Sequence, residues 1–372
     1  MSGSRVGWVG PAARWTGRLP AASPEPVTVI PGLVDVHCHG GGGFGFPEAD
    51  IEGCEHAARH HRSVATTTML ASLVSAPADV LLRRVRLLAD LTEGGEVAGV
   101  HLEGPFLSVR RCGAQDPANV IDGDPGLLEK LLDAGRGTVR SMTLAPETPH
   151  FTELATVLRR HGAVPSLGHT DASSAATRDA VVAASGGPLS ATHLFNGMAP
   201  MHHRRPGAVA ACLAAAARDE LVVELIGDGV HLADETVSAV FDLVGPNQIA
   251  LVSDAIAAAG MPDGRYPLGS VDVDVADGVA RLAGRRAIAG GTSRLLDVVR
   301  RAVAHAGIDL AAAVTAASLT PARLLGLNSE VGDLATGLRA DLALLGDDLD
   351  LIAVMRSGRW ISRRPAQAGE DA

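Results

Sequence analysis

The chain alternates short, nearly continuous apolar runs with longer segments whose apolar residues recur at helical spacing. Several runs are rich in β-branched residues, which is typical of strands buried on both faces of a parallel sheet. There are eight such runs: Leu33–Val36, Val64–Leu70, Val97–Leu102, Val139–Leu144, Ala163–Leu167, Leu189–Thr192, Leu221–Ile226 and Gln248–Val252. The segments between them, such as Leu81–Leu91, Phe151–His161 and Asp171–Ala184, predict helices. Eight strand–helix units in about 300 residues predict an α/β fold, the (β/α)8 TIM-type barrel.

The two ends of the chain differ from this repeating middle. Residues 1–29 are rich in Gly, Pro and Ala, and residues 330–372 have the pattern of short strands broken by Gly and paired Asp. All three tryptophans, Trp8, Trp15 and Trp360, lie in these terminal segments. Because chain termini often lie close together, we expect residues 1–29 and 330–372 to form one small β-rich, β-sandwich-like domain. The barrel would then span residues 30–329.

Polar side chains follow most of the predicted strands at the point where each strand ends. In a barrel of this kind, the C-terminal ends of the strands surround one mouth, so residues at these positions converge on one site. The residues concerned are His37, His39, Glu103, His169, His193, Asp228, His231 and Asp254. The recurrence at successive strand ends predicts an active site there.

The residue types at these positions favour metal binding. His37 and His39 are two apart on a strand, so both imidazoles face the same side. Glu103, His169 and His193 add a carboxylate and two imidazoles, a set that suits Zn²⁺ or a similar divalent ion. With Asp254 there are six candidate ligands, more than one tetrahedral zinc takes. We therefore expect two metals about 3.5–4 Å apart, bridged by Glu103. The choice among Zn, Mn, Fe, Co and Cd stays open.

Composition narrows the class of protein further. A formal net charge of −10 argues against nucleic acid or an anionic membrane as the main partner. The four cysteines form no CxxC pair, and no N-terminal stretch has the pattern of a secretory signal. The longest fully apolar run, Ala208–Ala217, is too short to span a membrane. A soluble, cytoplasmic protein that acts on a small molecule is expected.

Five strings of residues resemble the N-acetylglucosamine-6-phosphate deacetylase family of the amidohydrolase superfamily in both order and spacing. They are Pro31-Gly-Leu-Val-Asp-Val-His-Cys-His, His101-Leu-Glu-Gly-Pro-Phe-Leu, Gly168-His-Thr, Thr192-His-Leu-Phe-Asn-Gly-Met and Val252-Ser-Asp-Ala. The resemblance covers about Pro31 to Leu342. It implies a (β/α)8 barrel with a small β-domain, a homodimer, and hydrolysis of the acetamide of N-acetyl-D-glucosamine 6-phosphate.

The resemblance also assigns roles to individual residues. Glu103, His169 and His193 match the metal ligands of the family, and His37 and His39 match the first-strand pair of members with two metals. Asp254 matches the catalytic aspartate, which would pass the proton of the attacking water to the leaving amine. His231 matches a substrate-binding histidine that would stabilise the developing oxyanion.

For the substrate, the matching positions are Asn196, Gly197 and Arg204 for the phosphate and Cys112 and Gln115 for the sugar. Arg204 is expected to reach the active site of the neighbouring subunit. Many relatives carry His at the position of Gln115.

Other readings stay open. The substrate could be another N-acetyl-hexosamine 6-phosphate, such as N-acetylgalactosamine 6-phosphate, because a C4 epimer needs only a small change in the pocket. A cyclic-amide hydrolase is disfavoured because Glu103 stands where such enzymes often carry a lysine. A non-catalytic scaffold would tend to lose ligands, and a base deaminase would need a Cys-containing zinc signature. His60 and His61, on a predicted helix away from any strand end, are expected at the surface.

Overall fold

A computed structural model describes residues 3–17 and 27–363 of the 372-residue chain. Its main sheet has eight strands, all paired in parallel, in the order β11-β10-β9-β8-β7-β6-β5-β2. They are β2 (Leu33–Asp35), β5 (Thr66–Val74), β6 (Gly99–Glu103), β7 (Val139–Leu144), β8 (Val164–Leu167), β9 (Ser190–Ala191), β10 (Val222–Leu225) and β11 (Ile249–Leu251). The predicted (β/α)8 barrel is confirmed, although β5 runs on to Val74, beyond its predicted end at Leu70.

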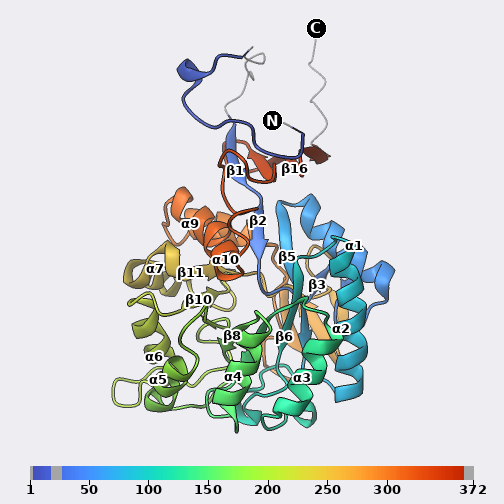
Figure 1. Ribbon diagram of the computed structural model, residues 1–372, viewed down its shortest axis with the longest axis vertical. Coiled ribbons are helices and arrows are strands. Elements are labelled where there is room, and N and C mark those ends of the chain that lie inside the picture. Colours follow the sequence, from blue (N-terminus) through green and yellow to red (C-terminus); the bar gives the residue numbers. More distant parts are fainter. Residues whose placement is uncertain (1–2, 18–26, 364–372) are drawn as a thin grey trace.

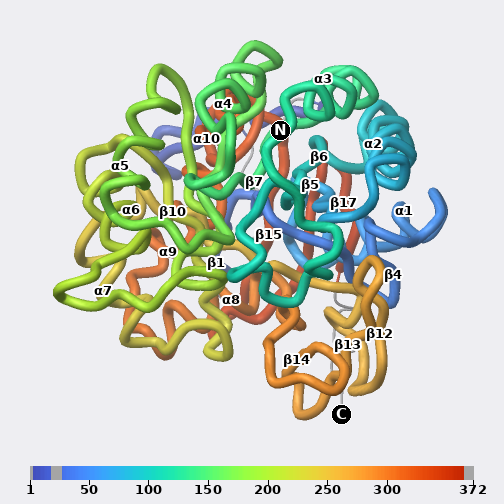
Figure 2. Tube along the Cα trace, turned by 90° about the horizontal axis from the view of Figure 1, so that it is seen from below, coloured from blue at the N-terminus to red at the C-terminus, as the bar shows by residue number. Residues whose placement is uncertain are grey.

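A helix follows each barrel strand and covers the outside of the barrel (Figures 1 and 2). These helices are α1 (Ile51–Ser63), α2 (Ala78–Glu93), α3 (Pro125–Ala134), α4 (Phe151–Arg160), α5 (Ser174–Ala183), α6 (Gly207–Ala216), α7 (Asp234–Val244) and α8 (Leu295–Ala304), with α9 (Leu310–Ala316) and α10 (Leu319–Leu324) after them. In α2 the buried residues Leu81, Val85 and Leu88 recur at helical spacing and face the strands. No helix in the described ranges is both long and apolar enough to cross a membrane.

The barrel closes between its first and last strands just beyond their C-terminal ends. No ladder joins β2 to β11 within the described residues, but Cys38 and Ala255 form a parallel bridge. The N–H of His39 donates to the carbonyl of Ala255 (2.7 Å), and the N–H of Asp254 donates to the carbonyl of His37 (3.0 Å). The residues that close the barrel are therefore candidate site residues.

A three-stranded antiparallel sheet is inserted between β11 and α8. It consists of β12 (Gly264–Leu268), β13 (Val271–Ala276) and β14 (Val279–Leu282), which lie together at one side of the barrel (Figure 2). This sheet was not among the predicted elements, although the alternation in β13 and the Asp277-Gly278 turn are typical of a β-hairpin. A shorter ribbon, β3 (Gly40–Gly41) with β4 (Phe44–Gly45), follows β2.

Both ends of the chain contribute to a four-stranded antiparallel sheet that lies at one end of the barrel (Figure 1). β1 (Thr28–Pro31) pairs with β15 (Leu342–Leu345), followed by β16 (Leu351–Arg356) and β17 (Arg359–Arg363). The predicted small domain also includes residues 1–2, 18–26 and 364–372, which lie outside the described residues. Its boundaries stay a prediction.

Asp341 links this small sheet to the barrel. Its side chain is buried and accepts a hydrogen bond from Nε of Arg339 (2.8 Å) and from the N–H of Ser357 (2.7 Å). Arg339 in turn donates to Oγ1 of Thr68 in β5 (2.9 Å). The charge of a buried carboxylate must be satisfied in this way, because leaving either partner alone in the interior is costly.

We expect Asp341→Ala to lower the free energy of unfolding by about 2–4 kcal/mol, because it removes the carboxylate partner of Arg339 and the acceptor of the Ser357 N–H. Urea unfolding measures the change. The control is Asp79→Ala, which breaks an exposed ion pair with Arg83 and should leave the unfolding midpoint where it is. Equal effects of the two substitutions would contradict the role of Asp341.

Candidate functional site

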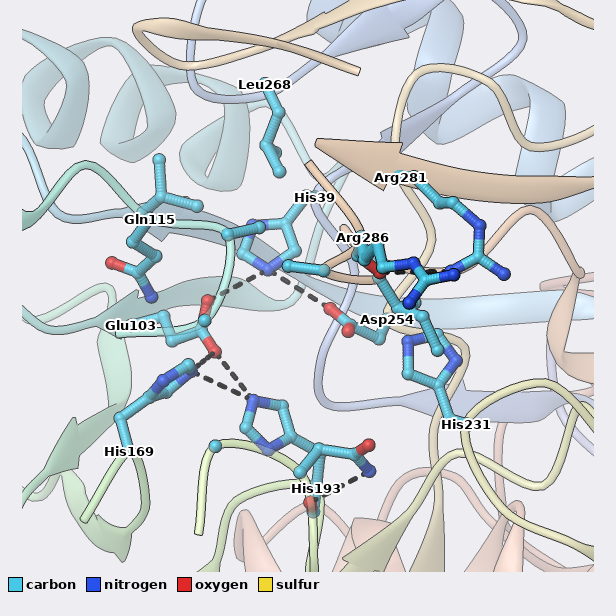
Figure 3. Close-up of a pocket in the computed structure, with 18 residues that line it drawn as sticks. His39, Glu103, Gln115, His169, His193, His231, Asp254, Leu268, Arg281 and Arg286 are labelled. Atoms are coloured by element: carbon cyan, nitrogen blue, oxygen red, sulfur yellow. Dashed lines mark hydrogen bonds and ion pairs between the residues drawn. The ribbon is translucent and has the colours of Figure 1, made fainter. Parts of the chain in front are cut away.

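Six predicted ligands converge at the mouth of the barrel (Figure 3). They form two sets, His37 with His39 and Asp254, and Glu103 with His169 and His193. Within each set the donor atoms lie within 4.8 Å of one another, and all six residues are buried. The strand ends thus bring together the side chains that the sequence pattern indicated.

Glu103, the last residue of β6, lies between the two sets. Its Oε1 is 2.8 Å from Nε2 of His169 and 2.9 Å from Nε2 of His193. Its Oε2 is 3.3 Å from Nε2 of His39, which also lies 3.3 Å from Oδ1 of Asp254. One carboxylate therefore faces imidazoles of both sets, which is the position of a group that could be shared by two ions.

Three of these residues have a backbone conformation that is uncommon for residues other than glycine. His169, His193 and Asp254 have φ values of +47°, +27° and +47°. Each lies two or three residues after the end of its strand, and its side chain belongs to one of the two donor sets. Such strain concentrates at functional sites, where the surrounding structure holds it in place.

Acceptors behind the imidazoles fix their orientation. Nδ1–H of His37 donates to Oε2 of Glu224 (3.1 Å), which also accepts from the N–H of His193 (3.3 Å). Nδ1–H of His169 donates to the carbonyl of Arg111 (2.7 Å). These bonds leave Nε2 of His37 and His169 facing the centre of the site, as metal-binding histidines require.

Glu224 was not among the predicted site residues. The available signal was an acidic residue inside the apolar run Leu221–Ile226, because a fully buried carboxylate needs a partner. Glu224 is 2% exposed in the structure.

The electrostatics of the cluster suit a bound cation. Burial acts to lower the pKa of His37, but the charges of Glu103 and Asp254 hold it well above its usual range. Burial likewise acts against protonation of His39, yet hydrogen bonds to Asp254 and Glu103 raise its pKa to about 9. Two buried carboxylates thus attract positive charge to the site. Divalent ions fit this donor set, because imidazole and carboxylate are their usual ligands.

A cavity of about 380 Å³ opens above the cluster. Gln115, Asn196, Gly197 and His231 line it, as predicted for residues that contact a substrate. Nδ1–H of His231 donates to Oδ2 of Asp228 (2.8 Å), which holds the ring at the cavity wall.

Gln115 has a free donor at this cavity. Its Oε1 accepts the N–H of Ser75 (2.8 Å), and Gln115 is only 6% exposed. Its Nε2 has no hydrogen-bond partner among the described residues. An unpaired buried amide is costly, so a ligand group that accepts this hydrogen bond would be favoured.

Two predicted substrate contacts do not reach the cavity in the single chain. Cys112 is not among the lining residues, although Gly113 and Gln115 of the same loop are. Arg204 lines a second cavity of about 760 Å³, with Arg111 and Arg205, that contains none of the six candidate ligands.

The prediction that His61 lies at the surface was wrong. The side chain is fully buried, with Nε2 at 2.8 Å from the carbonyl of Gly40 and 3.4 Å from Sγ of Cys38. The ribbon β3–β4 packs against α1 at this point, so the face of α1 that carries His61 points inward.

Comparisons with known proteins agree with this geometry. The amidohydrolase family pattern matches residues 28–361. N-acetylglucosamine-6-phosphate deacetylase of Bos taurus is 33% identical over 90% of this chain and 83% of its own length. N-acetylgalactosamine-6-phosphate deacetylase of Escherichia coli O157:H7 is 31% identical over 93% of both chains.

A solved structure is similar over nearly the whole chain. It is a mutant of N-acetyl-D-glucosamine-6-phosphate deacetylase from Mycobacterium smegmatis in complex with N-acetyl-D-glucosamine-6-phosphate. The two chains are 43% identical, with a TM-score of 0.91, over 97% of this chain and 93% of the other. The chain therefore belongs to the amidohydrolase family, and its predicted resemblance to the N-acetylglucosamine-6-phosphate deacetylases is confirmed.

Proposed function

We propose that the protein hydrolyses the acetamide of N-acetyl-D-glucosamine 6-phosphate to glucosamine 6-phosphate and acetate. The observation that carries this proposal is the pair of buried donor sets joined by Glu103 beneath a cavity of about 380 Å³. The similarity to deacetylases of this substrate over nine tenths of the chain supports it.

Two divalent ions would occupy the cluster, with Zn²⁺ as the first choice and Mn, Fe, Co or Cd as alternatives. His37, His39 and Asp254 would hold one ion, His169 and His193 the other, and Glu103 would serve both. Bound ions would supply Lewis acidity toward the acetyl carbonyl and toward water.

Asp254 would transfer protons during the reaction, and His231 would stabilise the negative charge that develops on the substrate. Asp254 lines the cavity, where its carboxylate would take a proton from the attacking water and return it to the amine nitrogen. Burial acts to lower the pKa of His231, but its hydrogen bond to Asp228 raises it. The ring can therefore keep a proton on Nε2 and donate it as a hydrogen bond to the developing oxyanion.

The remaining predicted contacts would orient the sugar. Gln115 would donate its unpaired amide N–H, and Asn196 and Gly197 would meet the phosphate. In a homodimer, Arg204 would enter the cavity of the partner subunit, since it does not line that of its own. Cys112 would reach the sugar only if its loop closed over the cavity.

The relative from Escherichia coli O157:H7 favours a second candidate, N-acetylgalactosamine 6-phosphate, which differs only at C4. Turnover of the two sugars by the same enzyme preparation distinguishes them. A kcat/KM higher for the galactose epimer would replace the first proposal.

Asp254→Asn should lower kcat for acetate release by roughly 10²–10⁴-fold, the contribution of a general acid–base group. Acetate release from metal-loaded wild type and variant measures it, with metal content determined for both because Asp254 also belongs to a donor set. Absence of turnover by fully metal-loaded wild type would overturn the proposed substrate.

Glu224→Gln should weaken metal affinity by roughly 10–100-fold, since the amide no longer fixes the ring of His37 as the carboxylate does. Competition with a chelator measures the affinity. The control is Glu220→Gln, which removes an exposed carboxylate next to the same strand and should leave the affinity as it is. An unchanged affinity in Glu224→Gln would refute the role of Glu224.

Mixing two impaired variants tests the role of Arg204. Suppose that Arg204 acts across a dimer. Activity should then return when Arg204→Gln subunits exchange with Asp254→Asn subunits. The mixed dimer has one complete site, which combines the intact Asp254 of one subunit with the intact Arg204 of the other. If Arg204 acts within its own subunit, or plays no part, mixing restores nothing. Sedimentation of the wild type reports whether the dimer exists.

A further inference from the structure

One buried histidine of the barrel has no part in the proposed reaction. His101 is on β6 and is only 1% exposed. Because residues two apart on a strand face the same side, His101 lies in the barrel interior directly behind Glu103. The interior of such a barrel is usually filled by bulky branched side chains. A histidine at this depth needs hydrogen bonds, since an unpaired buried polar group is costly.

Both nitrogens of the His101 ring lie within hydrogen-bonding distance of a hydroxyl group. Nδ1 is 3.0 Å from Oγ of Ser72 on β5, and Nε2 is 3.0 Å from Oγ1 of Thr143 on β7. The hydroxyl of Thr143 is 2.8 Å from Oγ1 of Thr192, which is 2.6 Å from Oγ of Ser166 on β8. All five residues are buried. A continuous chain of hydrogen bonds thus holds the His101 ring in one orientation across the barrel interior.

His101 and Ser72 together contact the two candidate ligands that follow β2. The rings of His101 and His37 pack edge to face, with their centroids 4.5 Å apart. Oγ of Ser72 accepts a hydrogen bond from the N–H of Cys38 (3.0 Å), the residue between the two histidines. The carbonyl of Ser72 accepts a hydrogen bond from Nδ1–H of His39 (3.2 Å). The hydrogen bond between His101 and Ser72 therefore orients the hydroxyl that holds this short segment.

These contacts reach one of the two donor sets and not the other. We call His37, His39 and Asp254 the first donor set, and Glu103, His169 and His193 the second donor set. In the part of the chain that the structure describes, His101 makes no hydrogen bond and no ring contact with a member of the second set. A change at His101 should therefore disturb the first set and spare the second.

We propose that His101 is a positioning residue for the metal ion that the first donor set would hold. This inference rests on the proposed function, which assigns one divalent ion to each set. His101 is not itself a ligand. Its ring supports the ring of His37, and its hydrogen bond directs the Ser72 hydroxyl to the N–H of Cys38. Residues that orient ligands in this way contribute about 10–100-fold to metal affinity.

The test measures the binding of Co²⁺ by metal-free protein, because the visible absorption of the bound ion reports each binding event without turnover. His101→Phe keeps a ring next to His37 and removes both hydrogen bonds of the imidazole. We expect it to weaken the affinity for one of two ions by about 10–100-fold and to leave the affinity for the other unchanged. His39→Gln removes a ligand of the first set and so identifies the ion that this set binds.

Ser72→Ala tests the route through the Ser72 hydroxyl. We expect it to weaken the affinity for the same ion as His101→Phe does. The double variant should lose little more affinity than the weaker-binding single variant, because both substitutions break one shared hydrogen bond. Losses that add up in full would overturn the proposal.

Two buried threonines supply a matched comparison. Thr143→Val removes the partner of Nε2 of His101 and should weaken the affinity for the first-set ion. Thr66→Val is the control, since Thr66 is a fully buried residue of β5 whose hydroxyl has no hydrogen-bond partner among the described residues. It should bind both ions as wild type does. If His101→Phe does not fold, Thr143→Val and Ser72→Ala still decide the question.

Three results would overturn the proposal. Equal weakening of both ions by His101→Phe would mean that His101 only supports the fold, and unchanged affinity for both would mean that it positions neither set. The third is a wild type whose first donor set binds no ion. Absence of acetate release by a wild type that binds two ions would instead refute the proposed substrate and leave this proposal standing.

Discussion

Residues of the candidate site form the hydrogen bonds that close the barrel just beyond the ends of β2 and β11. The N–H of Asp254 donates to the carbonyl of His37, and Oγ of Ser253 donates to Oδ2 of Asp35 (2.6 Å). Asp35 is fully buried, and burial raises its pKa to about 6 in spite of the hydrogen bonds that it accepts. These hydrogen bonds hold the end of β2 next to the end of β11. Closing the barrel therefore also brings Asp254 close to His37 and His39. Fold and site are thus formed by the same contacts.

Burying the charged groups of this cluster costs free energy, which the rest of the structure must offset. Glu103, Asp254 and Glu224 are buried carboxylates, and each lies next to histidine nitrogens. Desolvating such charges is expensive unless they are paired, and a divalent ion is the partner that best neutralises them. Metal binding in such a site is coupled to stability, since the unfolded chain offers no preformed set of ligands.

Part of the cavity wall, in contrast, comes from segments outside the strand–helix repeat. Gln115 comes from the loop after β6, and Arg281 and Arg286 come from the sheet inserted after β11. Loops at the C-terminal face of a barrel can change without disturbing the closed sheet beneath them. The chain is similar over nine tenths of its length both to a relative named for a glucosamine derivative and to one named for a galactosamine derivative.

The sequence alone determined the barrel and the six candidate ligands. Apolar runs and the polar residues that end them are local features, and β7 coincides with its predicted run. Contacts between remote segments were decided only by the tertiary structure: Glu224 meets His37 across 187 positions, and His61 is buried against the β3–β4 ribbon. The alternation in β13 could have revealed the inserted sheet, but its arginines reach the cavity only because that sheet packs on Ile256. Periodicity reports which way a side chain faces, whereas its partner depends on how distant elements pack together.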